Sequence, residues 1–169
     1  VAVIRVGAAT ETEMKYLKLK IEDAVNATKA AIDEGIVAGG GVALIKAAQK
    51  VLENQAGLKN VSKEFELGYQ IVLKALESPL KQIAMNAGKD DGSVIVEKVK
   101  NGKGNFGYDA LKDEMIADMI VAGIVDPVKV TRLGVQNACS ASAILLTTEA
   151  AIAEEVKEEN NSSTAPAGM

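Results

Sequence analysis

The sequence predicts a mainly α-helical fold with a few short β-strands at its edges. Apolar residues recur at steps of three and four along several stretches, which is the pattern of helices that bury one face. Capping residues, glycines and prolines separate these stretches. Hydrophobic residues make up 48% of the 169-residue chain, although aromatic residues make up only 3%. We therefore expect helices that pack mainly through alanine, valine, isoleucine and leucine, in a chain long enough for a real core.

The start of the chain predicts a strand followed by a long helix. Residues 1–7, VAVIRVG, are rich in β-branched side chains, and the chain opens without a methionine. We therefore expect a fragment of a longer protein, whose first strand pairs with sequence missing here. Thr10 and Glu13 have the spacing of a capping box, and apolar residues then recur at helical steps up to Ile32. Gly35 supplies the expected C-terminal stop.

Asp23 lies on a second face of this helix, apart from the main apolar stripe. Leu19, Ala27 and Ala30 share that face, and the two alanines leave room beside the carboxylate for a small ligand. The alternative is a solvated aspartate near Lys20, which would contribute little as an exposed helix pair. The spacing alone favours this second interpretation.

Three glycines, Gly39 to Gly41, separate the first helix from a second one predicted from Val42 to Leu52. Glycines allow positive φ angles and the close approach of a ligand, and a helix N-terminus favours oxygen-rich ligands. The stretch lacks the lysine and hydroxyl of a Walker A loop, and no strand is expected before it. A tight turn between helices is therefore the interpretation that the spacing favours.

The middle of the chain predicts three further helices separated by turns. Serine caps begin the first two, at Ser62 and at Ser78, and Pro79 suits the first helical position after a cap. The predicted segments are a loop at 57–60, a helix from Val61 to about Leu76, a short helix from Ser78 to Gly88, a turn at 89–93, and a brief helix from Val94 to Val99 that ends near Gly102.

A glycine-rich bend at 102–107, GKGNFG, leads into a predicted short strand or hairpin edge at Tyr108–Ala110. Asp109 stands beside this bend. Aspartate in such a place most often accepts hydrogen bonds from nearby backbone N–H groups. The glycines are also compatible with the edge of a ligand site, so both possibilities stay open.

Asp126 and Pro127 mark the predicted start of the last long helix. Aspartate followed by proline is the pattern of an N-cap and a first helical residue, and an apolar stripe continues up to Leu145. Capping accounts for Asp126 structurally, although its carboxylate also suits a ribose hydroxyl. We expect a final short strand at 147–152 and a disordered polar tail at 154–169.

Charge and residue types argue against several classes of function. The 19 basic and 23 acidic residues give a net charge of −4 with no basic run, so binding to nucleic acid or to an anionic membrane is not expected. A single cysteine and no histidine exclude an internal disulfide and any histidine triad. Cys139, in the small-residue run 138–143, is expected to be a buried structural thiol.

Five segments, in this order, carry a resemblance to a known family: VAVIRVGAAT, EDAVNATKAAIDEGIVAGGGVALI, ESPLKQIAMNAG, GNFGYDA and GIVDPVKVTR. Together they closely resemble the C-terminal part of the GroEL-type group I chaperonins, over nearly the whole chain except the tail. The resemblance implies that residues 1–34 supply a strand and long helix of the intermediate domain. It implies that residues 35–153 are the C-terminal half of the equatorial ATPase domain, a helical bundle.

The same resemblance implies an ATP site shared with sequence outside this chain. Asp23 matches the family's catalytic aspartate, which moves onto the nucleotide and helps to position or activate the attacking water. At the position of Asp109 the best-known bacterial member has asparagine, so an amide donor is absent here. Mg²⁺ is expected to be bound mainly by residues outside the chain, and the isolated chain to be inactive. The implied nucleotide contacts are Gly40 at the sugar and base, Asp109, Ala110 and Leu111 at the adenine, and Asp126 at the ribose.

The resemblance further implies an ATP-driven protein-folding machine. Its members form rings of seven subunits, usually stacked in pairs, and they act on unfolded client proteins with a lid-like co-chaperonin. A cytoplasmic bacterial location is expected, with an organellar homologue as the alternative. Two other classes are a non-enzymatic helical scaffold or interaction domain and a self-contained nucleotide-binding enzyme. The latter is disfavoured because no Walker lysine or complete metal site can be assembled here.

Overall fold

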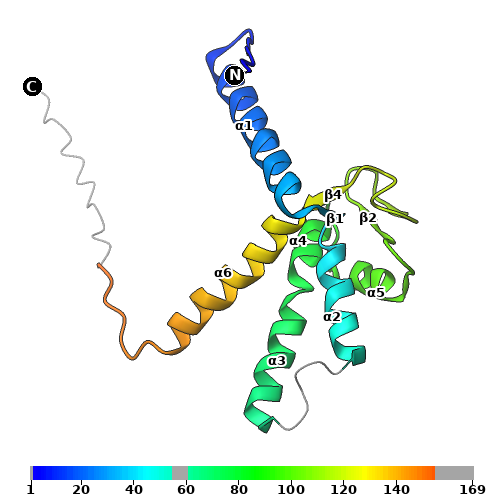
Figure 1. Cartoon of the computed structure of the whole chain (residues 1–169), viewed down its shortest axis with the longest axis vertical. Coiled ribbons are helices and arrows are strands. Elements are labelled where there is room, and N and C mark those ends of the chain that lie inside the picture. Colours follow the sequence, from blue (N-terminus) through cyan, green and yellow to red (C-terminus); the bar gives the residue numbers. More distant parts are fainter. Residues whose placement is uncertain (1, 55–60, 155–169) are drawn as a thin grey trace, which may run out of the picture.

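A computed structural model describes residues 2–54 and 61–154, and within them six α-helices and four three-residue β-strands. Figure 1 shows α1, α3 and α6 extending in different directions from the region where β1 and β4 meet. The predicted class of fold, mainly α-helical with a few short strands, is confirmed. The elements are α1 (Glu11–Glu34), β1 (Ile36–Ala38), α2 (Val42–Asn54), α3 (Lys63–Ala75), α4 (Ser78–Asn86), α5 (Ser93–Asn101), β2 (Gly107–Asp109), β3 (Glu114–Ile116), β4 (Val125–Pro127) and α6 (Val128–Leu146).

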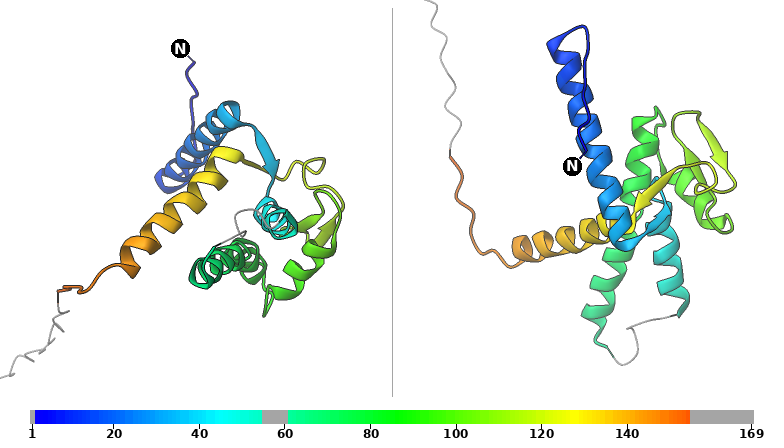
Figure 2. Two further views of the ribbon diagram at one scale, coloured as in Figure 1. Left: turned by 60° about the horizontal axis from the view of Figure 1, so that its bottom comes forward. Right: turned by 45° about the horizontal axis from the view of Figure 1, so that its top comes forward.

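The long helix α1 begins and ends where its capping residues predict. The Glu13 N–H donates a hydrogen bond to the Thr10 hydroxyl at 3.2 Å, and Gly35, with a φ of 86°, donates its N–H to the Ala31 carbonyl at 2.8 Å. The expected burial of one face does not occur, because none of the α1 residues is buried. Figure 2 shows why: α1 projects from the rest of the chain and meets it at its C-terminal end.

Two ion pairs join the end of α1 to the start of α6. Lys129 Nζ lies 2.6 Å from Asp33 Oδ2, and Arg132 donates to both carboxylate oxygens of Glu34, at 2.6 and 3.0 Å. The Arg132 guanidinium lowers the pKa of Glu34, and the Asp33 carboxylate raises the pKa of Lys129. These contacts hold the C-terminal end of α1 against the first turns of α6.

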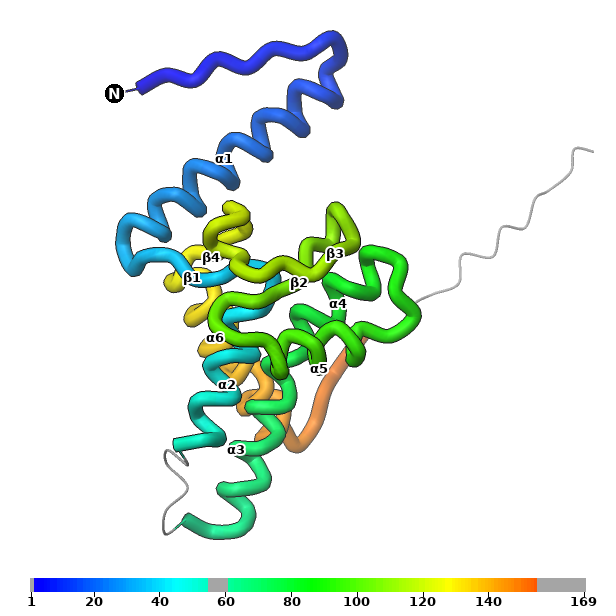
Figure 3. The backbone as a smooth tube through the Cα atoms, turned by 90° about the vertical axis from the view of Figure 1, so that its right-hand side faces the viewer, coloured from blue at the N-terminus to red at the C-terminus, as the bar shows by residue number. Residues whose placement is uncertain are grey.

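The predicted strand at the start of the chain is not formed. Residues 2–8 have no strand pairing, and they run back from the start of α1 as extended chain (Figure 3). Ile4 shares an apolar groove with Leu17 and Ile21 of α1. A strand requires the backbone hydrogen bonds of a neighbouring strand. No described segment offers them there, so these β-branched residues stay unpaired.

Two antiparallel strand pairs are formed, one between segments distant in the sequence and one within a hairpin. β1 pairs with β4, with Ile36 opposite Pro127, and β2 pairs with β3 in a hairpin, with Gly107 opposite Ile116. The sequence predicted a strand or hairpin edge at Tyr108–Ala110 and missed β1, β3 and β4. Strands of three residues are too short to show the alternation that identifies a strand.

The core lies between α2, α4, α5 and the β2–β3 hairpin, which adjoin one another in Figure 3. Ile45 of α2, Leu80 of α4 and Val96 of α5 expose 2% or less of their surface. Gly102 ends α5, as predicted. The hydrophobic contacts of this cluster fix the positions of the loops that join these elements.

The two predicted serine caps have different outcomes. Ser62 caps α3, because its hydroxyl accepts a hydrogen bond from the Phe65 N–H at 3.3 Å. Ser78 does not cap α4 and is its first helical residue instead. The preceding residue, Glu77, already has helical φ and ψ angles, so the backbone has turned into the helix before the serine is reached.

Several side chains predicted to be buried are exposed on α3 and α6. Phe65 and Val72 of α3 expose 53% and 38% of their surface, and Val130 and Leu145 of α6 expose 54% and 75%. Cys139 of α6 is also exposed, which contradicts the expected buried thiol. Only part of the α3 face is covered, where Leu73 is buried beside Ile45 of α2, and the side chains named here stay on the surface.

The predicted strand at 147–152 is not formed either. The Thr147 hydroxyl donates to the Ala143 carbonyl at 2.9 Å, and the Thr148 hydroxyl donates to the Ile144 carbonyl at 2.8 Å. These β-branched residues therefore occupy the carbonyls at the end of α6 and pair with no strand.

In the described part of the chain no helix has the length and apolar character needed to cross a bilayer. The predicted loop at 57–60 and the tail from residue 155 lie outside the described residues.

Candidate functional site

The turn at Gly39–Gly41 is the centre of the candidate site. Gly40 and Gly41 have φ angles of 65° and 79°, which confirms the predicted use of positive φ. A Cβ on Gly41 would lie 3.0 Å from the Leu80 backbone nitrogen. The expectation that no strand precedes this turn is wrong, because β1 leads directly into it. The arrangement is a strand, a tight glycine turn and a helix.

Asp126 lies in β4 opposite Val37, and it does not cap a helix. The predicted cap is displaced by one residue: Pro127 is the N-cap, and α6 begins at Val128. Pairing with β1 keeps Asp126 extended, with its carboxylate near the Gly40 N–H. Burial raises the pKa of Asp126, and the Gly40 N–H opposes that rise.

Asp109, at the end of β2, keeps its carboxylate within its own turn. The residue exposes 8% of its surface, and its Oδ1 accepts hydrogen bonds from the Leu111 N–H at 2.9 Å and the Lys112 N–H at 3.3 Å. This is the local bonding expected of an aspartate beside glycines. Ala110 is half-buried and Leu111 is 94% exposed. The Asp109 side chain therefore shapes the segment, and the following residues reach the surface.

The glycine turn, β4 and β2 meet at one place. The Tyr108 carbonyl oxygen lies 3.8 Å from the point where a Cβ on Gly40 would stand, and the Met119 methyl lies 3.3 Å from the same point. Asp126 of β4 lies opposite Val37 of β1, the strand that leads into the glycine turn, and the Gly40 N–H lowers the pKa of its carboxylate. Five of the six predicted site residues thus lie on segments that the fold brings together.

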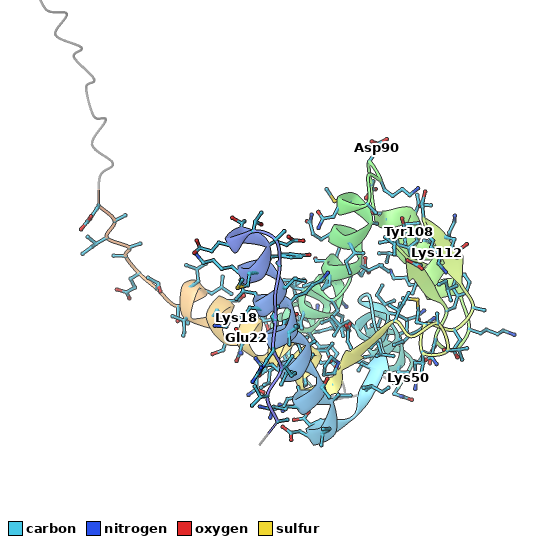
Figure 4. All side chains as sticks on the ribbon, turned by 90° about the horizontal axis from the view of Figure 1, so that it is seen from above. Lys18, Glu22, Lys50, Asp90, Tyr108 and Lys112 are labelled. Carbon is cyan, nitrogen blue, oxygen red and sulfur yellow. The ribbon has the colours of Figure 1, made fainter. Side chains whose placement is uncertain are left out.

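Asp23 is the predicted site residue that the structure does not bring to this place. It is exposed on α1, twelve residues before Gly35, which corresponds to about 18 Å along the helix. Figure 4 shows Glu22, its neighbour, and Tyr108 on separate sides of the molecule. This exposure agrees with the alternative of a solvated aspartate, and Lys20 Nζ lies 5.2 Å from the centre of the Tyr16 ring.

Met119 is a contributor to the site that the sequence does not reveal. It is fully buried, and its N–H donates to the Asn105 carbonyl at 3.0 Å. A Cβ on Gly107 would lie 2.5 Å from Met119 Cγ, so the methionine fills the space between the glycine turn and β2. A methionine in an irregular stretch gives no periodic signal, and only the folded chain identifies its position.

The Asp126 carboxylate has acceptor capacity left for a ligand. An ionised carboxylate accepts about four hydrogen bonds, and among the described residues the Gly40 N–H is the one donor that lowers its pKa. Sugar hydroxyls are donors that suit such a half-buried acceptor, so these residues fit a ribose. Within residues 2–54 and 61–154, histidine, cysteine, aspartate and glutamate side chains form no group of three or more that could hold a metal ion.

Two comparisons place the chain among known proteins. A family model described as the TCP-1/cpn60 chaperonin family matches residues 1–156. A solved structure, titled as the crystal structure of a group III chaperonin in the open state, is 27% identical to this chain, with a TM-score of 0.72. The match covers 87% of this chain and 30% of that chain, so the present chain spans less than a third of its length. The chain belongs to the TCP-1/cpn60 chaperonin family.

Proposed function

We propose that this chain is part of a GroEL-type group I chaperonin, an ATP-dependent ring that encloses non-native proteins and promotes their folding. The observation that carries the proposal is the meeting of Gly40, Asp126 and Tyr108–Leu111 at one place. These residues come from three of the segments that resemble that group. A scaffold of helices has no need to bring a glycine turn, a half-buried carboxylate and an aspartate turn together.

Each of these residues has a proposed role in binding ATP. The Asp126 carboxylate accepts hydrogen bonds from a ribose hydroxyl, and Gly40, without a side chain, lets the sugar and base approach the backbone. Asp109, Ala110 and Leu111 contact the adenine. When bound, ATP supplies the phosphoanhydride bond whose hydrolysis drives the machine, with Mg²⁺ held mainly by residues outside this chain.

Asp23 is the proposed catalytic residue. Its exposure on the projecting helix α1 suits a carboxylate that is brought to the nucleotide by movement and is kept away from it otherwise. There it orients or activates the attacking water, because phosphoryl transfer depends mainly on positioning and electrostatics. In this division residues 1–34 belong to the intermediate domain and residues 35–153 to the equatorial ATPase domain.

The proposed assembly is a ring of seven subunits, usually stacked in pairs, that works with a lid-like co-chaperonin on unfolded proteins in the bacterial cytoplasm. The exposed apolar faces of α3 and α6 support burial against other protein surfaces. They also favour a second candidate, a non-enzymatic helical scaffold, which predicts no dependence on nucleotide.

The test of the proposed function is the Asp23→Ala variant of the full-length protein. It should bind ATP as tightly as the unmodified ring and lose turnover by about a hundredfold, in the range that a positioned general base contributes. Calorimetry measures the binding and phosphate release measures the turnover.

Glu22→Gln is the matched control, because it neutralises a neighbouring exposed carboxylate that pairs with Lys18 at 3.6 Å. Turnover should be kept in the control. Normal turnover in Asp23→Ala would reject the catalytic assignment. Absence of ATP binding and turnover in the unmodified ring would favour the scaffold. We expect the isolated chain to hydrolyse no ATP, since it lacks the remaining ligand groups.

A further inference from the structure

Asp113, in the turn of the β2–β3 hairpin, has a strained backbone. Its φ is 57°, and among the described residues it is the only one other than glycine with a positive φ. Side chains with a Cβ rarely adopt this conformation, although aspartate tolerates it better than most. Such residues persist where the surrounding contacts enforce them, and they gather at functional sites.

Two side chains hold the Asp113 carboxylate from different elements. Lys89 Nζ donates to Oδ2 at 2.7 Å, and the Tyr108 hydroxyl donates to Oδ1 at 2.8 Å. The hydrogen bond from Lys89, followed by that from Tyr108, lowers the pKa of Asp113, and the same carboxylate raises the pKa of both partners. The three residues form one network across the hairpin and the end of α4.

Both partners of Asp113 are held in place, Lys89 by its backbone at the end of α4 and Tyr108 within the core. The Lys89 N–H donates to the Ala84 carbonyl at 3.1 Å and the Gly88 N–H donates to the Met85 carbonyl at 3.0 Å, with a φ of 89° at Gly88. This is the Schellman arrangement at a helix end. Ala84 is fully buried, and Tyr108 exposes 3% of its surface. The lysine and the tyrosine therefore approach Asp113 from fixed positions.

The network reaches both halves of the proposed nucleotide site. Asp113 closes the far end of the loop that Asp109 begins with its bonds to the N–H groups of Leu111 and Lys112. At its other end, the Tyr108 carbonyl packs beside the Gly40 backbone. A change in the Asp113 contacts should therefore alter the conformation of the Asp109–Leu111 segment and of the turn at Gly39–Gly41.

We propose that Lys89 and Asp113 are positioning residues that hold the Asp109–Leu111 segment in the conformation that receives the base. The inference rests on the proposed function. Lys89 and Asp113 touch no nucleotide in this scheme, and they act through Tyr108 and the hairpin turn. The pair is exposed, with 36% and 55% of the two side chains accessible, so it adds little to global stability. Its contribution is the shape of the loop.

The test uses the full-length ring with Lys89→Met and Asp113→Asn. If either change leaves the loop in its binding conformation about one tenth of the time, the apparent Kd for ATP rises about tenfold. Turnover at saturating ATP should be unchanged, because Asp23 and the phosphate ligands are untouched. Hydrogen exchange of the peptide 107–116 should become faster in both variants.

Three further variants sharpen the test. Lys89→Arg restores the ion pair and should restore the affinity. Asp113→Gly relieves the strain at φ 57° without supplying a carboxylate, so it should still bind ATP more weakly than the unmodified ring. Lys15→Met is the matched control, because it removes another exposed lysine from a 2.7 Å ion pair far along α1, and it should change nothing.

Equal ATP affinity in Lys89→Met, Asp113→Asn and Lys15→Met would overturn the positioning role, and so would a loss of turnover at saturating ATP with unchanged affinity. Failure of the unmodified ring to bind ATP is a separate result. It would reject the proposed function itself, whatever the exchange of the hairpin.

Discussion

Asp126 shows at the residue scale how a half-buried carboxylate is placed at the expense of stability. Its pKa is raised by burial, so the folded chain holds the proton more tightly than the unfolded chain does. The stability that this adds is complete below the unfolded pKa and is lost as the pH rises through the raised, folded pKa. Once ionised, the half-buried carboxylate therefore lowers the free energy of unfolding.

Asp126→Asn should remove the cost of burying this charge while keeping a side-chain oxygen near the Gly40 N–H. The urea midpoint of the variant should equal that of the unmodified chain at acid pH, where both side chains are neutral, and exceed it once the pH has risen through the raised, folded pKa. Urea titrations across that range, followed by circular dichroism, measure the difference. A gap that is constant with pH would show that the burial of charge is not responsible. In the full ring the variant should bind ATP more weakly.

The role of Asp126 could not be derived from local sequence, whereas that of Asp109 could. Asp109 bonds to the N–H groups of Leu111 and Lys112, so its whole environment lies within a few residues of it. Asp126 was assigned as a helix cap because a local rule applies to aspartate before proline. Its actual partner strand comes from Ile36–Ala38, far away in the chain, and a pairing of three residues leaves no signal in the sequence.

Lys46 shows at the element scale how a helix end is satisfied inside the fold. Its ammonium donates to the carbonyls of Val99 and Gly102 at 2.7 and 2.6 Å, at the C-terminal end of α5. The last carbonyls of a helix have no partner within the helix, and a positive charge there also opposes the negative end of the helix dipole. Burial lowers the pKa of Lys46, which marks an ammonium taken partly out of water.

Lys46→Met should lower the free energy of unfolding by about 1–3 kcal/mol, because the carbonyls of α5 lose their donor. The methionine keeps most of the aliphatic stem, so packing is changed little. Lys50→Met, on the exposed side of the same helix, is the control and should be near neutral. Urea unfolding of this chain measures both. Equal midpoints for the two variants would show that water replaces the lysine without loss.

Helices were the most predictable elements, and their burial was the least. The threonine cap at Thr10, the stop at Gly35 and the serine cap at Ser62 depend on neighbours within one turn, and all three are present. Which face is covered depends on what packs against the helix, and a periodic stripe only states that a face is apolar. The exposed Phe65 and Cys139 follow from this difference.

Extensive apolar exposure is the main property of the whole molecule. Three consecutive residues at the end of α6, Ile144, Leu145 and Leu146, expose 67%, 75% and 86% of their surface. Contiguous apolar patches on soluble proteins mark places where other protein surfaces dock. The described chain by itself therefore presents surfaces that favour association.

The isolated chain should self-associate with increasing concentration, and the double variant Leu145→Gln with Leu146→Gln should shift it toward monomer. Each fully buried leucine contributes about 1.5–3 kcal/mol. Even if the two leucines are only partly buried in the associated state, replacing both should weaken association by tenfold or more. Sedimentation velocity over a range of concentrations measures this. Val121→Gln, at a single side chain that is 86% exposed, is the control and should leave association unchanged. A chain that stays monomeric without these changes would contradict the expectation.

The connection at Gly35 has a mechanical consequence. The helix on one side of it is stiff, and the twelve residues back to Asp23 make an arm of about 18 Å. A swing of about 10° around that glycine carries the Asp23 carboxylate through an arc of about 3 Å, which is the length of one hydrogen bond. Such a swing is resisted by the Asp33 and Glu34 ion pairs at the very base of the arm, where their leverage is smallest. A small rotation at one residue is thus enlarged into a displacement of several ångströms at Asp23.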